Sequence, residues 1–153
     1  MEDRKLSKMS LSGNAALEST SGLKVNCEAR GKKIVFDEPK ELGGTDTGMN
    51  PIEGLLTSLG ACKCIVAKVA ADKMGIKLDS IEVECKGTLD TGGFTGTNPD
   101  AKVGLSDIQS VFSIKSPASD EEIKNLVDFV NSHCPVHDTI DSPPPLTHTI
   151  KRV

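Results

Sequence analysis

The sequence has no tryptophan and no tyrosine, and only four of its 153 residues are phenylalanine. Proteins that bind single-stranded nucleic acid usually present aromatic side chains on which bases stack, and nucleic-acid-binding proteins generally carry a basic face. Here 22 acidic residues outnumber 18 basic ones, which gives a formal net charge of −4. We therefore expect no nucleic-acid partner.

Long apolar runs are also missing, and we expect no signal peptide. No uninterrupted stretch of about 18 apolar residues occurs, so we expect no membrane span. The residues from Met1 to Lys5 are mostly charged and do not resemble a signal peptide. Hydrophobic residues make up 37% of the chain and charged residues 26%, which is typical of a globular domain. We expect a cytoplasmic protein with a flexible N-terminal arm over residues 1–12 and one domain over residues 13–153.

The pattern of apolar residues predicts an α+β domain with a largely antiparallel sheet. Asn50 and Pro51 are typical of an N-cap and a first helical position, and apolar residues then recur at helical spacing as far as Met74. The other expected elements, in chain order, are a hairpin turning near Gly31, strands at 81–85 and 105–114, a helix opened by the capping box Ser119 to Glu122, and a final strand at 146–153. Because strands and helices do not alternate regularly, a parallel sheet is not expected.

Five cysteines, at positions 27, 62, 64, 85 and 134, are an odd number and do not indicate a secreted disulfide framework. Cys27 and Cys85 lie on the apolar faces of expected strands, where a small buried thiol is usually structural. Cys62 and Cys64 point about 200° apart on a helix, so they cannot easily join or share a metal ion. Cys62 faces the apolar side, where it is either a core residue or a reactive thiol.

Cys134 lies at the end of the expected second helix, between His133 and His137. A neighbouring imidazole can favour the reactive thiolate, although both histidines could equally be solvated loop residues. A zinc site is disfavoured, because C-x-C spacing is too short and Cys134 with His137 supplies only two ligands. The sequence has no G-x-S-x-G elbow, P-loop or G-x-G-x-x-G. We expect no metal and no cofactor.

Two separated motifs resemble the OsmC/Ohr family. The first runs from Asp37 to Gly44 and continues as Asn-Pro-Ile-Glu-Gly-Leu-Leu-Thr-Ser-Leu-Gly-Ala-Cys over residues 50–62, and the second is His-Cys-Pro-Val over residues 133–136. The resemblance covers about residues 22–153 and includes the order of the elements. It implies an OsmC-like fold, with the sheet packed on a long central helix, in an intertwined homodimer whose active sites lie where the subunits meet.

The resemblance also implies a chemistry. Well-studied members of the family are thiol peroxidases that act on organic hydroperoxides as antioxidants in the oxidative stress response. Carried over, Cys62 would attack the peroxide and become a sulfenic acid, and Cys134 would resolve it to a disulfide. A dithiol reductant, lipoyl-type in the peroxidase branch, would restore both thiols.

The chain departs from the peroxidase branch at one position. There a Glu directly follows Asn-Pro and positions an Arg that lowers the pKa of the thiol, whereas here Ile52 follows and the acid is Glu53. Glu53 lies about 180° around the helix from Cys62, and Arg30, the candidate partner, falls in a strand. Arg30 and Glu53 are candidate catalytic residues with Cys62 and Cys134, and the chain resembles the broader OsmC-like branch. The alternative function is a binding protein or redox sensor for an apolar ligand at the dimer interface.

Overall fold

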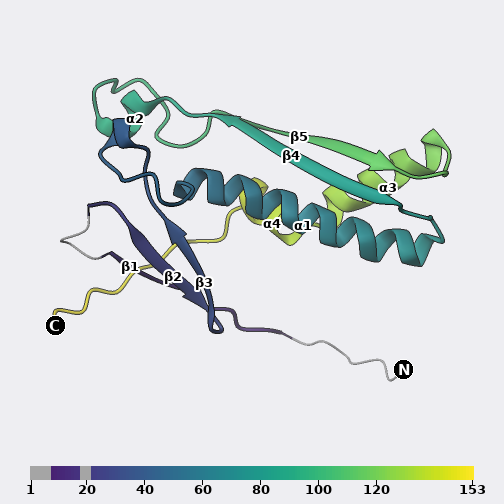
Figure 1. Cartoon of the computed structure of the whole chain (residues 1–153), viewed down its shortest axis with the longest axis horizontal. Helices are drawn as coiled ribbons and strands as arrows, with labels where there is room; N and C mark the ends of the chain where they lie inside the picture. The colour runs from purple at the N-terminus through teal and green to yellow at the C-terminus, as the bar shows by residue number, and fades with distance from the viewer. Residues whose placement is uncertain (1–7, 18–21) are drawn as a thin grey trace. The chain divides into compact units, whose positions relative to one another are not determined.

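The computed structural model describes residues 8–17 and 22–153 (Figure 1). The chain forms two compact units, Met1–Gly54 and Leu55–Val153, and each is described by itself. Residues 8–12 form neither helix nor strand, while the rest of the expected N-terminal arm, residues 1–7, lies outside the described residues. The arm and the single domain over residues 13–153 stay predictions.

The first unit contains an antiparallel sheet of β1 (Asn14–Leu17), β2 (Val25–Ala29) and β3 (Lys32–Phe36), in that order. The expected hairpin is confirmed: Ala29 pairs with Lys32, and both turn residues, Arg30 and Gly31, have positive φ angles of 52° and 76°. Such a two-residue turn matches the twist of the strands. Strand β1 was not predicted, because its short segment is exposed throughout and has no alternating pattern.

A loop that contains the short helix η1 (Lys40–Leu42) follows β3 and is organised by one buried carboxylate. Asp37 accepts hydrogen bonds from the backbone N–H of Glu38 and from the N–H and hydroxyl groups of Thr45 and Thr47. The Thr45 hydroxyl is the largest of the contributions that hold the pKa of Asp37 well below its usual range.

Helix α1 (Pro51–Met74) matches the predicted helix. Asn50 caps it: its Oδ1 accepts from the Glu53 N–H at 2.8 Å, and Glu53 Oε2 accepts from the Asn50 N–H at 2.8 Å. By length and composition α1 could cross a membrane, which counting uninterrupted apolar runs did not anticipate. One such helix is weak evidence, because the central helix of a globular core passes the same test. The absence of a membrane partner stays a prediction.

The second unit is built around the larger part of α1. The long ribbon of β4 (Ser80–Thr88) and β5 (Asp107–Lys115) runs beside the helix and pairs antiparallel, as predicted (Figure 1). A core cluster joins α1 to the helix α3 (Asp120–His133), and its buried members are Ala67, Ala70, Ala71, Leu126 and Val130. The capping box of Ser119 and Glu122 is confirmed at the start of α3.

Three details of this unit differ from expectation. Helix α2 (Thr91–Thr95) forms inside a segment expected to be a loop, with Asp90 accepting from the Gly92 N–H. Helix α4 (Pro135–Asp141) begins directly after Cys134, because proline suits the first position of a helix. The final strand expected at 146–153 was wrong, since these residues form no strand and make no ladder in the chain.

Candidate active site

Cys62 and Cys134, distant in the sequence, lie together in the second unit. Cys62 is half-buried on α1, while Cys134, 1% exposed, joins α3 to α4. The Cys134 side chain lies close enough to Cys62 to raise the pKa of the Cys62 thiol, and both cysteines are free thiols. The structure therefore brings together the two cysteines that the family resemblance paired.

The break between α3 and α4 places Cys134 at this point. Pro135 disfavours helical dihedrals at the preceding residue, and Cys134 is extended, with φ −80° and ψ 112°. Its Sγ then accepts a hydrogen bond from the His137 N–H at 3.4 Å, which caps α4. The neighbouring N–H of Val136 lies close enough to Cys62 to lower the pKa of that thiol, although other causes outweigh it. The same turn of backbone thus influences both cysteines.

The environment of Cys62 favours the protonated thiol. Burial is the main cause that raises the pKa of Cys62, and the nearby Cys134 side chain raises it further. The N–H of Val136 acts in the opposite direction but does not outweigh burial. Within the second unit, Cys62 is therefore held near a second thiol without being strongly activated as a thiolate.

A buried lysine beside this pair was missed by sequence reasoning. Lys63 is 3% exposed, and its Nζ donates to Ser110 Oγ on β5 and to Asn131 Oδ1 on α3, both at 2.9 Å. The Nζ also lies 5.4 Å from the centre of the Phe112 ring. The sequence does contain one indication that Lys63 is buried. It lies four residues from both Leu59 and Ala67, so all three share one face of the helix.

The other predicted catalytic residues lie in the first unit. Arg30 is an exposed residue of the β2–β3 turn. Glu53 is engaged in the capping box of α1, where its carboxylate accepts from the Asn50 backbone. The catalytic roles of Arg30 and Glu53 beside Cys62 stay predictions. Cys64 projects from the opposite side of α1 to Cys62, as helical geometry requires.

The two candidate histidines are held by their own segment. His133 stacks on Phe129, with ring centres 3.8 Å apart, and its Nδ1 lies 3.0 Å from the Phe129 carbonyl oxygen and 2.9 Å from Ser132 Oγ. His137 contributes its backbone N–H to Cys134. In the described ranges, 8–17 and 22–153, no group of three His, Cys, Asp or Glu side chains could hold a metal ion. The absence of a metal or cofactor stays a prediction.

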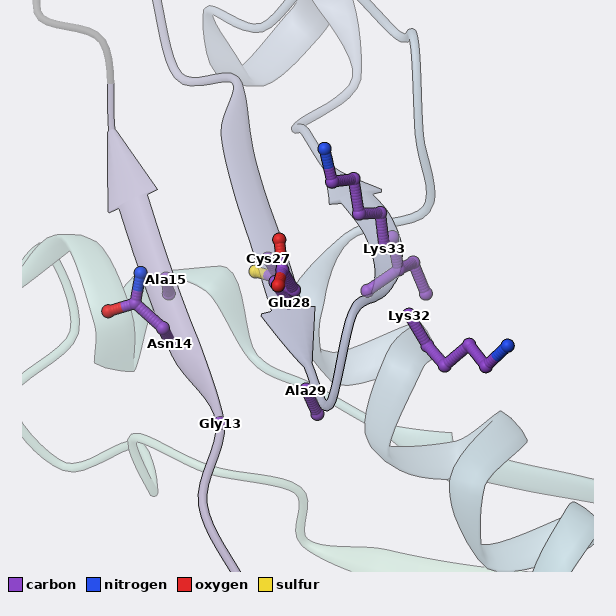
Figure 2. A pocket seen from close by; sticks show the side chains of 9 residues that line it. Gly13, Asn14, Ala15, Cys27, Glu28, Ala29, Lys32 and Lys33 are labelled. Carbon is purple, nitrogen blue, oxygen red and sulfur yellow. The ribbon is translucent and has the colours of Figure 1, made fainter.

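The first unit carries a hollow on its sheet, which Figure 2 shows at close range. Cys27 lines it, together with Glu28, Lys32 and Lys33 (Figure 2). Neither Cys62 nor Cys134 belongs to its lining. The thiol pair therefore remains the candidate active site.

Comparison with known proteins identifies the class of protein. The family model described as OsmC-like protein matches residues 44–149. A hydroperoxide reductase of Mycoplasma genitalium is 33% identical over 118 residues, which cover 76% of this chain and 77% of that protein. A hydroperoxide reductase of Mycoplasma pneumoniae is 34% identical over 97 residues, 63% of this chain and 64% of its own.

Solved structures agree with this result. The crystal structure of an OsmC-like protein from Mycoplasma pneumoniae has a TM-score of 0.77 and 28% identity, covering 90% of this chain and 91% of that one. An organic hydroperoxide resistance protein from Legionella pneumophila has the same fold, with a TM-score of 0.63 and 17% identity over 90% and 93% of the two chains. The chain belongs to the OsmC-like family, and its α+β architecture with a long helix is the fold of that family.

Proposed function

We propose that the protein is a thiol-dependent peroxidase that reduces organic hydroperoxides through Cys62 and Cys134. The neighbouring pair of thiols carries the proposal, because it places a second sulfur near the first within one unit of the chain. The Mycoplasma relatives named hydroperoxide reductase support the choice of substrate.

The proposed reaction has three steps. The Cys62 thiolate attacks the outer peroxide oxygen, the O–O bond breaks, and the alkoxide takes a proton to leave as an alcohol. Cys134, as its thiolate, attacks the sulfur of the Cys62 sulfenic acid, and hydroxide leaves and is protonated to water as the disulfide forms. An external dithiol then reduces this disulfide and is itself oxidised.

The exposure of the two thiols suits their order of reaction. Half-buried Cys62 can be reached from outside the chain, whereas Cys134 is shielded from the peroxide. Cys62 also shares its side of α1 with the apolar residues Leu59 and Val66. Apolar neighbours favour an alkyl hydroperoxide over hydrogen peroxide, because burial of the alkyl group contributes free energy of binding.

We also propose that the protein acts as a homodimer in the cytoplasm. Ile65 and Val69, one turn apart on α1, are 66% and 49% exposed within a single chain. Only 33% of the most apolar 18-residue stretch of this helix is buried within a single chain. A second copy of the chain would cover this apolar face. Within a single chain the pKa of Cys62 is raised, and Arg30 would lower it in the assembled protein by stabilising the thiolate.

A redox sensor or ligand-binding protein is the second candidate. The raised pKa of Cys62 favours it, because only the thiolate attacks peroxides and a smaller thiolate fraction slows the reaction. In that case the thiol pair would oxidise only occasionally, or an apolar ligand would occupy the site without reacting.

Steady-state turnover with a dithiol reductant separates the two functions. Cumene hydroperoxide should be converted to cumyl alcohol at a rate at least about tenfold above that of hydrogen peroxide, in keeping with apolar binding. No alcohol above the uncatalysed background would exclude the peroxidase. Equal rates with both peroxides would remove the proposed preference for organic substrates.

A further inference from the structure

Among the residues that the structure describes, Lys63 is the one buried cation, and the proposed chemistry does not use it. With 3% of its surface exposed, it has lost most of its hydration. The partners found for its Nζ are neutral: one hydroxyl, one amide oxygen and the face of an aromatic ring. Burying a charge without an opposite charge is costly, and an apolar residue would fill the same space at less cost. The position of the lysine therefore calls for an explanation other than core stability.

Its hydrogen bonds connect the two segments that carry the reacting thiols. Lys63 directly follows Cys62 on α1, so the two side chains diverge by about 100°. Asn131 lies one turn before Cys134 on α3. The 2.9 Å bond between Lys63 Nζ and Asn131 Oδ1 therefore ties the Cys62 segment to the Cys134 segment. The second bond, to Ser110, reaches a strand that carries neither thiol.

We propose that Lys63 and Asn131 form a clamp that positions Cys134 for attack on the oxidised Cys62. Disulfide formation requires Cα atoms no more than about 7 Å apart and a narrow range of side-chain torsions. Rotation of α1 about its axis, or sliding of α3 along it, would move the sulfurs out of this geometry. A charged donor and an amide acceptor resist both movements, because separating them removes one of the two hydrogen bonds of the buried ammonium. Lys63 and Asn131 are positioning residues, since the hydrogen bond between them involves neither sulfur atom.

The clamp rests on the proposed function only for its kinetic consequence. It acts on the second step, in which the sulfenic acid and thiol condense with loss of water. The first step needs Cys62 and the peroxide alone, so it should not depend on the clamp. This difference distinguishes positioning from a general loss of stability, which would affect both steps.

Two substitutions that each remove one neutral acceptor from Lys63 provide the test. Asn131→Leu removes the acceptor on α3, and Ser110→Ala removes the one on β5. We expect Asn131→Leu to slow condensation about tenfold or more, because small misplacements of reacting groups carry penalties of this size. Ser110→Ala and the exposed control Lys68→Met should remain within about twofold. Dimedone trapping of the sulfenic acid and mass spectrometry of the disulfide follow the two steps separately.

Rescue provides a second readout. Asn131→Asp keeps an acceptor oxygen toward Lys63 and should restore most of the rate that Asn131→Leu loses. A folded Asn131→Leu protein that condenses at the rate of the unmodified chain would overturn the clamp. Equal slowing by Ser110→Ala would also overturn it, because the effect would then come from the polar network as a whole.

The thiol–disulfide equilibrium tests the clamp without any peroxidase activity. In a dithiothreitol redox buffer, Lys63→Met should lower the stability of the Cys62–Cys134 disulfide about tenfold, a shift of about 30 mV toward easier reduction. An unchanged equilibrium in this variant would contradict the clamp, and the measurement also replaces the kinetic test if Asn131→Leu does not fold. If the unmodified chain ignores hydroperoxides but Lys63→Met shows the shift, the proposed function fails while the clamp stands.

Discussion

Within the described part of the chain, each unit buries one charged side chain, and the two side chains find their hydrogen-bond partners in opposite ways. Asp37, 1% exposed, takes its hydrogen bonds from residues at most ten positions away, all within one loop. Lys63 bonds to residues 47 and 68 positions away, on a strand and on another helix. A charge with local partners organises its own loop, whereas one with distant partners fixes elements against each other. The second arrangement connects the two segments that carry the thiol pair, and so we assign the chemistry to the second unit.

Among substitutions that compare the two units, the largest effect on the rate of hydroperoxide reduction is expected at the thiols themselves. Cys62→Ser should lower hydroperoxide reduction at least about a hundredfold, because a serine hydroxyl is a very poor nucleophile at neutral pH. Cys27→Ser, a matched change in the first unit, should leave the rate unchanged. Measuring alcohol formation with a dithiol present checks both. Undiminished turnover by Cys62→Ser would show that the chemistry lies elsewhere.

Loss of the second thiol should affect turnover less. Cys134→Ser keeps Cys62 able to attack one equivalent of peroxide, but its sulfenic acid has no partner and reacts further to sulfinic acid. We expect one turnover at nearly the usual rate, then a decline over repeated additions of peroxide. Intact-mass spectra would show the added oxygens. Sustained turnover without sulfinic acid would mean that another thiol resolves Cys62.

The pH dependence should reflect the raised pKa of Cys62. Burial favours the protonated thiol, so the thiolate fraction should rise about tenfold per pH unit and keep rising above pH 8.5, the ordinary thiol pKa. Alkylation by iodoacetamide, followed by tryptic mapping, can report each thiol. Trypsin cleaves after Lys63, which places Cys62 and Cys64 on different peptides. A plateau below pH 7 would indicate activation by a cation in the assembled protein.

The smallest effect on chemistry is expected in the first unit. Asp37→Asn replaces a carboxylate that accepts five hydrogen bonds with an amide that has one acceptor oxygen. It should lower the thermal midpoint at pH 7 while leaving single-turnover peroxide reduction within about twofold.

The sign of the acid dependence follows from the lowered pKa of Asp37. Its contribution to stability is present above the ordinary Asp pKa of about 3.9 and is lost as pH falls toward its folded value. The difference between the midpoints of the two proteins should therefore shrink below about pH 4. A difference that stays constant with pH would remove the electrostatic explanation.

The parts of the fold that the sequence predicted depend on neighbouring residues. The hairpin turn near Gly31, the N-cap at Asn50 and the capping box at Ser119 are local, and all three formed as expected. The wrong final strand at 146–153 shows the limit of such patterns, because a strand also needs a partner along its edge. Helix α4 was not predicted. Pro135 ends the preceding helix and also begins α4, and the prediction from the sequence included only the first of these two effects.

The site could be predicted only in part for the same reason. Helical geometry placed Cys62 on the apolar side of α1, but its pairing with Cys134 came from the resemblance to a family rather than from spacing. Lys63 was missed because a lysine on an apolar stripe normally extends to solvent. Its burial depends on Asn131 and Ser110, whose positions the local sequence does not determine.

Disulfide mapping after a single addition of peroxide tests the central claim most directly. The fully reduced chain receives one equivalent of cumene hydroperoxide, is alkylated and is digested with trypsin. We expect a linked peptide pair that contains Cys62 and Cys134 and disappears on treatment with a dithiol. Thiols that remain fully alkylated after several minutes, or a disulfide that joins Cys62 to a different cysteine, would contradict it.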